Sequence, residues 1–569
     1  MQPQWIFPKE IPSDTFLENN LHPVVLSILR RRGFSNAKDI GIFLDKTLQS
    51  IHDPGLMKDM DKAVSRLLSA IEKKEKILVY GDYDVDGITA TSLLIHFFRR
   101  VNAFHDFYIP HRSEGYGMSL EGIDKAHKNG VKLVITVDTG TSSHEVIEHA
   151  NSLGLDVIVT DHHRPSKTLP RACAILNPNQ EGCAYPNKHL CGVGVAFKLV
   201  HACLKKMETE EDKSRQFLKS LLDFVTLGTI ADVCSLTGEN RAMVAYGLKH
   251  LAESIFPGIR TLLEQSNLSD QILTAGILAF RVIPKLNAAG RTDHAKISVK
   301  LLTEPDLGVC FSLFSKLEFC NKERREIEQD DLQRAIALVE ADQTHLRNRI
   351  LVVAHPSFHP GVNGIVASRL TERYHLPTIV MAMGEKGELK GSARTYAGIN
   401  IFSCIDSCKH LCMSFGGHLY AAGLTLSPDN LNEFKEGVSR YAEENFSTEM
   451  LQPKLKIDAN LNFDQVTEDF LRDLKSLGPF GMGNPEPAFL CQLAELRTPP
   501  QILKSKHLKL NLSQGDIKLE AIGFNLMDNI PFKLKAKDTI DLVCRVSSNM
   551  WQGEERTQLE ILDLKLSAQ

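Results

Sequence analysis

The sequence lacks the features of several broad classes of protein. No run of 18 consecutive apolar residues occurs in its 569 residues, so we predict no transmembrane helix and no membrane partner. The 12 cysteines have no regular spacing, which is not typical of a disulfide framework and favours a reducing compartment. The first residues, with neither a basic start nor a continuous apolar segment, predict no signal peptide. We therefore expect a cytoplasmic protein.

An excess of positive charge is also missing. The 66 Lys and Arg residues are outnumbered by 70 Asp and Glu residues, for a formal net charge of −4. Proteins that bind nucleic acid through their overall charge are basic, so any such binding here requires local patches. The chain has no glycine-rich loop followed by Lys-Ser or Lys-Thr, so we predict no dependence on ATP.

The first half of the chain alternates between short β-rich runs and segments compatible with helices. Such alternation is typical of βαβ units and predicts an α/β fold with a parallel sheet. A charged segment without Gly or Pro, 321–341, predicts a long connecting helix, and a second α/β block follows it. From about 455, short alternating runs predict an antiparallel β domain. The first four β-rich runs are 77–80, 107–109, 133–137 and 157–160.

Acidic and imidazole side chains follow three of these runs. Because the ends of parallel strands line one crevice, we expect these side chains to lie together. Crowded carboxylates repel one another unless a cation lies among them. Any single Asp could instead cap a helix, but three such motifs favour a metal site, for Mn²⁺ best, then Mg²⁺, then Zn²⁺. The residues are Asp82, Asp84, Asp86, Asp138, Asp161, His162 and His163.

The motifs GDYDVDG, VDTG and DHH, in this order, resemble the DHH family of phosphoesterases. The family's fourth motif, an Asp after a helical segment, corresponds to Asp232 in GTIAD. Four later segments resemble the RecJ branch of the family, whose members are 5′→3′ exonucleases specific for single-stranded DNA. The segments are 284–291, 359–369, 391–394 and 415–423, and the resemblance covers most of the chain.

The resemblance implies five parts. They are a helical leader (1–53), a DHH phosphoesterase domain (54–310), a connecting helix (311–345), a DHH-associated domain (346–450) and an OB-like nucleic-acid-binding domain (451–569).

The resemblance also implies a site for two Mn²⁺ or Mg²⁺ ions, Mn²⁺ being preferred. Within it, His163 would donate to the scissile phosphate and Asp161 would orient a histidine. Asp82 would be a ligand or a base, because Tyr80 stands where other branches of the family have a histidine. The implied ligands are Asp84, Asp86, Asp138, His162 and Asp232, with Asp138 bridging the two ions. Hydrolysis at such a site would release 5′-mononucleotides.

Recognition of a 5′-phosphate requires several donors at a fixed distance from the metals. Arg291, Ser392 and Arg394 suit this role, because guanidinium groups and hydroxyls bind phosphate and the neighbouring glycines predict loops that let main-chain N–H groups approach. The resemblance adds Asn287 and His418 as further contacts to the substrate.

The segment 501–537 carries seven lysines against three acidic residues, which fits either a single-strand-binding surface or a solvated sheet face. The expected partners are single-stranded DNA with a 5′ end, a single-strand-binding protein and a helicase. Two other functions stay open: a DHH phosphoesterase acting on short substrates, and a replication scaffold without activity.

Overall fold

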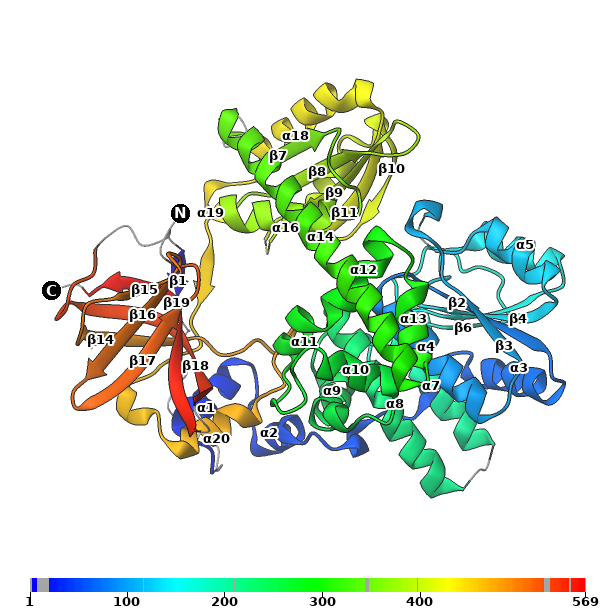
Figure 1. Cartoon of the computed structure of the whole chain (residues 1–569), viewed down its shortest axis with the longest axis horizontal. Helices are drawn as coiled ribbons and strands as arrows, with labels where there is room; N and C mark the ends of the chain where they lie inside the picture. The colour runs from blue at the N-terminus through cyan, green and yellow to red at the C-terminus, as the bar shows by residue number, and fades with distance from the viewer. Residues whose placement is uncertain are drawn as a thin grey trace. The chain divides into compact units, whose positions relative to one another are not determined.

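The computed structural model describes residues 3–7, 20–115, 117–207, 210–342, 347–396, 398–526, 533–551 and 554–567 (Figure 1). The chain forms two compact units. The first unit comprises Phe43–Arg324 and Gly478–Pro485, and the second comprises Met1–Ile42, Arg325–Leu477 and Glu486–Gln569. None of the described helices is both long enough and apolar enough to cross a membrane.

The first unit contains a parallel sheet of five strands, in the order β3-β2-β4-β5-β6. The predicted α/β class and parallel sheet are confirmed, and β6 is a strand that the sequence pattern did not reveal. The strand order reverses between β2 and β4, which is where open α/β sheets bind their ligands. The strands are β2 (Lys76–Gly81), β3 (His105–Tyr108), β4 (Val131–Val137), β5 (Asp156–Thr160) and β6 (Ala174–Leu176).

Alternate residues of these strands enter two different cores, because successive side chains of a strand point to opposite faces. Ile77 and Val79 pack with the core that includes α4 and α7, whereas Leu78 and Tyr80 pack with α5 and α6. Helices therefore cover both faces of the sheet. They are α3 (Met60–Glu72), α4 (Val85–Arg100), α5 (Leu120–Lys128), α6 (His144–Ser152) and α7 (Gly192–Lys206).

The rest of the first unit is helical, and its last helix carries the chain into the second unit. That helix, α14, begins 14 residues before the predicted segment, since Cys310, Phe314 and Leu317 give its first half an apolar face buried in the first core. The helices are α8 (Glu211–Ala231), α9 (Gly238–His250), α10 (Pro257–Glu264), α11 (Ala275–Arg281), α12 (Ile283–Thr292), α13 (Lys296–Thr303) and α14 (Leu307–Ala341).

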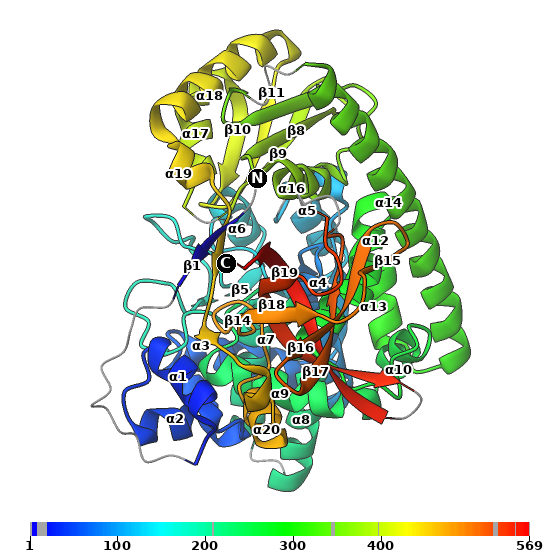
Figure 2. The same ribbon diagram turned by 90° about the vertical axis from the view of Figure 1, so that its left-hand side faces the viewer.

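The second unit contains a mixed sheet in the order β10-β11-β9-β8-β7, in which only β7 and β8 pair in parallel. Figures 1 and 2 show α16 on one face of this sheet and α18 on the other. The elements are β7 (Leu351–His355), α16 (Asn363–Tyr374), β8 (Thr378–Met383), β9 (Leu389–Arg394), α17 (Ile401–Asp406), β10 (Cys412–Gly417), β11 (Ala421–Leu426), α18 (Leu431–Asn445) and α19 (Thr448–Leu451).

The C-terminal strands close into a barrel, because β14 pairs with β16 as well as with β18. The expectation of an antiparallel domain is wrong for two pairs: β13 and β14 are parallel, and so are β17 and β19 within the barrel. A closed ring of five strands cannot alternate direction throughout, so one neighbouring pair must be parallel. The elements are β13 (Ala459–Asn460), α20 (Glu468–Ser476), β14 (Phe489–Leu496), β15 (Gln501–Leu503), β16 (His507–Gln514), β17 (Ile517–Gly523), β18 (Thr539–Trp551) and β19 (Glu554–Leu566).

The N-terminal segment packs on the barrel region of the second unit. Strand β1 (Gln4–Ile6) pairs in parallel with β12 (Lys454–Lys456), and the Trp5 indole donates to Asp563 at 2.6 Å. After α1 (Pro23–Arg31), Arg32 lies 3.9 Å from Asp458. The predicted helical leader is only partly helical where the structure describes it: it contains α1 and α2 (Ala37–Leu44) but also strand β1.

Candidate metal centre

The acidic motifs meet at the point where the strand order of the first sheet reverses. Asp82, Asp84 and Asp86 follow β2, Asp138 follows β4, and the DHH motif follows β5. The register aligns Gly81 with Val137 and Val137 with Thr160, so the three strands end at the same level. The sequence prediction that these side chains come together is therefore confirmed.

Helix termini hold the first two ligand candidates in place. Asp84 caps α4, its carboxylate accepting from the main-chain N–H groups of Asp86 and Gly87 at 2.9 and 3.1 Å. The Asp86 carboxylate accepts from the first two N–H groups of α7, those of Gly192 and Val193. Both anions thus lie at helix N-termini, where the helix dipole stabilises negative charge.

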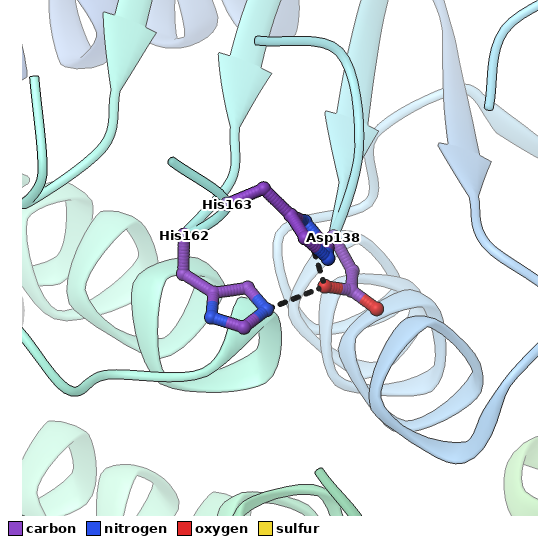
Figure 3. Close-up of side chains that lie close together, drawn as sticks. All are labelled: Asp138, His162 and His163. Carbon is purple, nitrogen blue, oxygen red and sulfur yellow. Dashed lines mark ion pairs between the residues drawn. The ribbon is translucent and has the colours of Figure 1, made fainter. Parts of the chain in front are cut away.

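Asp138 has a left-handed backbone with φ 61°, a conformation that glycine, Asn and Asp adopt more readily than other residues. Helix α7 approaches it so closely that a Cβ at Gly192 would lie 2.5 Å from the Asp138 Cβ. The glycine therefore allows the contact between α7 and Asp138. With this backbone, the Asp138 carboxylate lies in front of the DHH histidines, as Figure 3 shows.

The Asp161 carboxylate is hydrogen-bonded to its surroundings in the protein, including the ring of His163, which it orients. Its carboxylate accepts from the main-chain N–H groups of Thr141, His162 and His163, and from His163 Nδ1 at 2.8 Å. Burial alone would raise the pKa of Asp161, but the hydrogen bond and charge of His163 hold it well below its usual range. Burial would likewise lower the pKa of His163, but Asp161 raises it to about 9.

His162 connects the two halves of the site. Its Nε2 lies 3.0 Å from Asp138 Oδ1 (Figure 3). The same nitrogen lies 3.7 Å from Asp232 Oδ2 and 3.8 Å from Asp86 Oδ2. Asp232 directly follows α8. Burial lowers the pKa of His162, which favours the neutral imidazole that metals bind. One imidazole thus faces carboxylates from three separate segments.

The site contains buried polar atoms without partners. Among the described residues, Asp82 Oδ1, Asp138 Oδ1 and His162 Nε2 are buried and make no hydrogen bond. Burial, reinforced by Asp84, raises the pKa of Asp82 to about 8. Burial and neighbouring carboxylates also raise the pKa values of Asp86 and Asp138 well above the usual range. Unsatisfied carboxylates of this kind are costly unless a cation joins them.

The donor atoms fit divalent metal ions. Oxygens of Asp82, Asp84 and Asp138 lie within 4.8 Å of one another, and so do donor atoms of Asp138 with His162 and His163. Carboxylate oxygens with imidazole nitrogens suit Mn²⁺ and Mg²⁺. The structure thus brings all five predicted ligands and Asp82 into one site, while their individual roles stay predictions.

Sequence reasoning missed Arg112, which follows β3. Its guanidinium lies 4.5 Å from the Tyr83 ring, and its Nε donates to the Gly290 carbonyl at 3.0 Å. Arg112 is among the charges that lower the pKa of Asp82, although burial dominates that pKa. The only available signal was its place after a strand of the predicted sheet, since no acidic or glycine-rich motif marks it.

The candidate substrate-binding residues are divided between the two units. Most of them do not lie in the loops that the sequence predicted. Arg291 and Asn287 lie in helix α12, and Ser392 and Arg394 lie in strand β9. Gly391 is a strand residue because Leu424 packs against it, where a Cβ would lie 2.6 Å from Leu424 Cδ2. His418 does lie in a turn, between β10 and β11.

Arg394 occupies space that a glycine leaves open. A Cβ at Gly364 in α16 would lie 2.6 Å from Arg394 Nη2. The Arg394 Nη1 donates to the Ala393 carbonyl at 2.8 Å, and burial lowers the pKa of the guanidinium. Whether Arg291, Ser392 and Arg394 bind one phosphate stays a prediction.

Three family models match the chain: the DHH family N-terminal domain over residues 76–229, the DHHA1 domain over 347–444 and the RecJ OB domain over 457–563. The chain is 36% identical over 556 residues to the single-stranded-DNA-specific exonuclease RecJ of Bacillus subtilis, covering 97% of this chain and 69% of that protein. It is 35% identical over 570 residues to the protein of the same name from Escherichia coli, covering 97% of each.

A solved structure agrees with these sequence relatives. The crystal structure of RecJ from Thermus thermophilus in complex with Mn²⁺ matches with a TM-score of 0.84 and 27% identity, over 100% of this chain and 80% of that one. The same protein with Mg²⁺ matches with a TM-score of 0.77 and 27% identity, over 100% of this chain and 79% of that one. With the DHH motifs gathered at one sheet edge and the OB barrel closed, the chain belongs to the RecJ family of DHH proteins.

Proposed function

We propose that this protein is a metal-dependent exonuclease specific for single-stranded DNA. It degrades the strand from the 5′ end, releases 5′-mononucleotides, and acts in DNA repair and recombination. The observation that carries the proposal is the convergence of Asp82 Oδ1, Asp138 Oδ1 and His162 Nε2, all buried and without a hydrogen bond, at the reversal of the first sheet. The names of the relatives, single-stranded-DNA-specific exonuclease RecJ, support the substrate.

The site would hold two divalent ions, Mn²⁺ or Mg²⁺. The ligands we assign are Asp84, Asp86, Asp138, His162 and Asp232, with Asp82 as a sixth ligand or a base. Such ions, when bound, supply a Lewis acid and an activated water for in-line hydrolysis of a phosphodiester. Asp161 is buried, whereas the His163 side chain is 38% exposed, so His163 can reach the substrate from a fixed orientation. His163 then donates a hydrogen bond to the phosphate as its charge develops.

We assign recognition of the 5′ end to residues of both units, each contacting the DNA from its own unit. Arg291, Asn287 and the newly found Arg112 belong to the first unit; Ser392, Arg394 and His418 belong to the second. Arg394→Ala should lower kcat/KM on 5′-phosphorylated strands by about 10–100-fold, the range for a lost charged hydrogen bond. The rate on strands with a 5′-hydroxyl should change little. An equal loss on both substrates would reject the assignment.

The OB barrel would bind the strand beyond the active site. Of the seven lysines between 501 and 537, Lys509 lies on β16 and Lys518 on β17, and Lys509 pairs with Glu520 at 3.1 Å. A single-strand-binding protein and a helicase would supply the substrate in the cytoplasm. The domain boundaries at 53, 310, 345 and 450 are part of the same proposal.

The test uses one strand labelled at either end, with Mn²⁺, beside a blunt duplex and short RNA. Mononucleotides released only from the 5′ end of the single-stranded DNA are the expected result. Cleavage restricted to di- to tetranucleotides would instead assign the protein to the phosphoesterases of small substrates. Binding without cleavage would leave a scaffold.

A further inference from the structure

Cys234 places a sulfur atom beside two of the assigned metal ligands. Its Sγ donates to Asp232 Oδ2 at 3.0 Å, and His162 Nε2 lies 3.7 Å from the same oxygen. The sulfur, the nitrogen and a carboxylate oxygen all lie within 4.8 Å of one another. The thiol lies outside the ligand set that we assign to the two metal ions.

The surroundings of Cys234 differ from those of a cysteine that only fills a core. Buried cysteines usually behave as small apolar residues, whereas Cys234 is partly exposed and hydrogen-bonded to a carboxylate. With His162 and Asp232 it lines a cavity of about 400 Å³, whose other lining residues include Lys188, Ser235 and Met482. All of these residues belong to the first unit, so the cavity that the three donors line lies within that unit.

A triad of thiol, imidazole and carboxylate is selective for metals. Mn²⁺ and Mg²⁺ prefer oxygen, whereas Zn²⁺ binds Cys, His and Asp together in tetrahedral sites that leave a position for water. Zn²⁺ also exceeds Mn²⁺ in affinity for a given set of nitrogen, oxygen and sulfur donors. His162 Nε2, buried and without a hydrogen-bond partner, is available as the nitrogen donor.

We propose that Cys234, His162 and Asp232 form a site for Zn²⁺ that inhibits the enzyme. On binding, the thiol proton passes to solvent and the thiolate becomes a ligand; no other bond changes. Zn²⁺ inhibits because it takes two ligands, His162 and Asp232, from the Mn²⁺ pair. Binding of Zn²⁺ rests on the geometry alone, whereas its inhibitory consequence rests on the proposed nuclease function.

Co²⁺ titrated into the metal-free full-length protein tests the site without any nuclease assay. A thiolate ligand gives Co²⁺ a near-ultraviolet charge-transfer band, which we expect in the wild type and which Zn²⁺ should displace. Cys234→Ser and the smaller Cys234→Ala should both lose the band and bind Zn²⁺ about 10–100-fold more weakly. Cys412→Ser, which alters a partly exposed cysteine of the second unit, is the matched control and should keep both.

Inhibition is then measured as Zn²⁺ titrated against Mn²⁺-dependent cleavage, each variant being compared with its own uninhibited rate. The Zn²⁺ concentration for half-inhibition should rise by the same factor of about 10–100 in the Cys234 variants and stay unchanged in Cys412→Ser. A band that persists in both Cys234 variants, or is absent from the wild type, overturns the site even if Mn²⁺ supports cleavage. A band that depends on Cys234 in a protein that never cleaves DNA upholds the Zn²⁺ site and rejects the nuclease.

Discussion

The first unit buries two clusters of charge, and in only one of them is a lysine paired with the buried carboxylate. Lys198 and Glu239 form an ion pair of 2.7 Å with both side chains 0% exposed. Tyr185 also donates to Glu239, and Lys198 donates to the His52 carbonyl at 3.0 Å. At the metal centre, by contrast, the described residues show no ion pair between a Lys or Arg and Asp82, Asp86 or Asp138.

The difference separates a structural cluster from a functional one. Burial lowers the pKa of Lys198, but Glu239 opposes that effect, so the pair satisfies itself within the fold. Burial raises the pKa values of Asp86 and Asp138, and the neighbouring carboxylates raise them further instead of opposing burial. A buried cluster that is incomplete in this way requires a cation from outside the chain.

Removal of one carboxylate from the incomplete cluster should have the largest effect. Asp138→Ala should lower the rate of cleavage by more than about 100-fold, because the assigned bridging ligand is lost, while binding to single-stranded DNA stays measurable. Asp138→Asn, which tolerates the left-handed backbone, should behave alike, so that strain is not the cause. The exposed Asp61→Asn on α3 is the control. Full activity in either Asp138 variant would refute the two-metal assignment.

Removal of the counterion from the complete cluster should instead affect folding. Lys198→Met leaves Glu239 buried and unpaired, which typically costs about 3–5 kcal/mol. The double variant Lys198→Met with Glu239→Leu should recover part of that loss, since neither charge then remains buried. Thermal unfolding of the three proteins, with and without Mn²⁺, measures this. A Lys198→Met variant as stable as the wild type would show that Glu239 reaches solvent.

Removal of Mn²⁺ should change the thermal stability of the wild-type protein through the metal centre and not through the Lys198–Glu239 pair. At 100 times its Kd, Mn²⁺ should stabilise the folded state by about 2.7 kcal/mol. Asp138→Asn removes a buried carboxylate that lacks a cation, so the metal-free variant should melt above the metal-free wild type and gain less from Mn²⁺. The Lys198→Met variant should keep the full gain, because its altered charge lies outside the metal centre. A variant Asp138→Asn with an undiminished gain would contradict the assignment of Asp138 as a ligand.

The sequence alone was sufficient to predict which site residues come together wherever those residues belong to local motifs at strand ends. Asp84, Asp138 and His162 meet because the register of a parallel sheet aligns the ends of β2, β4 and β5. Arg112 and Cys234 carry no motif, and only the folded chain shows what lies beside them. Sequence analysis missed these two residues because the separation of two residues along the chain does not determine the distance between their side chains in the fold.

The predicted loop at a glycine was wrong because packing between distant segments, which local sequence does not show, decides the structure there. In the segment 391–394, Gly391 suggested a loop, yet it is a strand residue that accommodates Leu424. Similarly, alternation between 455 and 569 predicts strands but not that five of them close a ring, which imposes the parallel pair of β17 and β19. In both cases packing between distant segments decided the outcome over local pattern.

Among the acidic residues of the metal centre, substitution of Asp161 should lower activity least. Its carboxylate already has hydrogen-bond partners within the protein. Its oxygens already accept three main-chain N–H groups and the imidazole of His163. An Asn amide cannot accept all four, so Asp161→Asn should loosen His163 and lower kcat by about tenfold. Because we assign Asp161 no metal ion, we expect the Mn²⁺ concentration for half-maximal activity to stay the same. Mn²⁺ titrations of cleavage measure both quantities, and a shift in the Mn²⁺ requirement as large as that of Asp138→Asn would place Asp161 with the incomplete cluster instead.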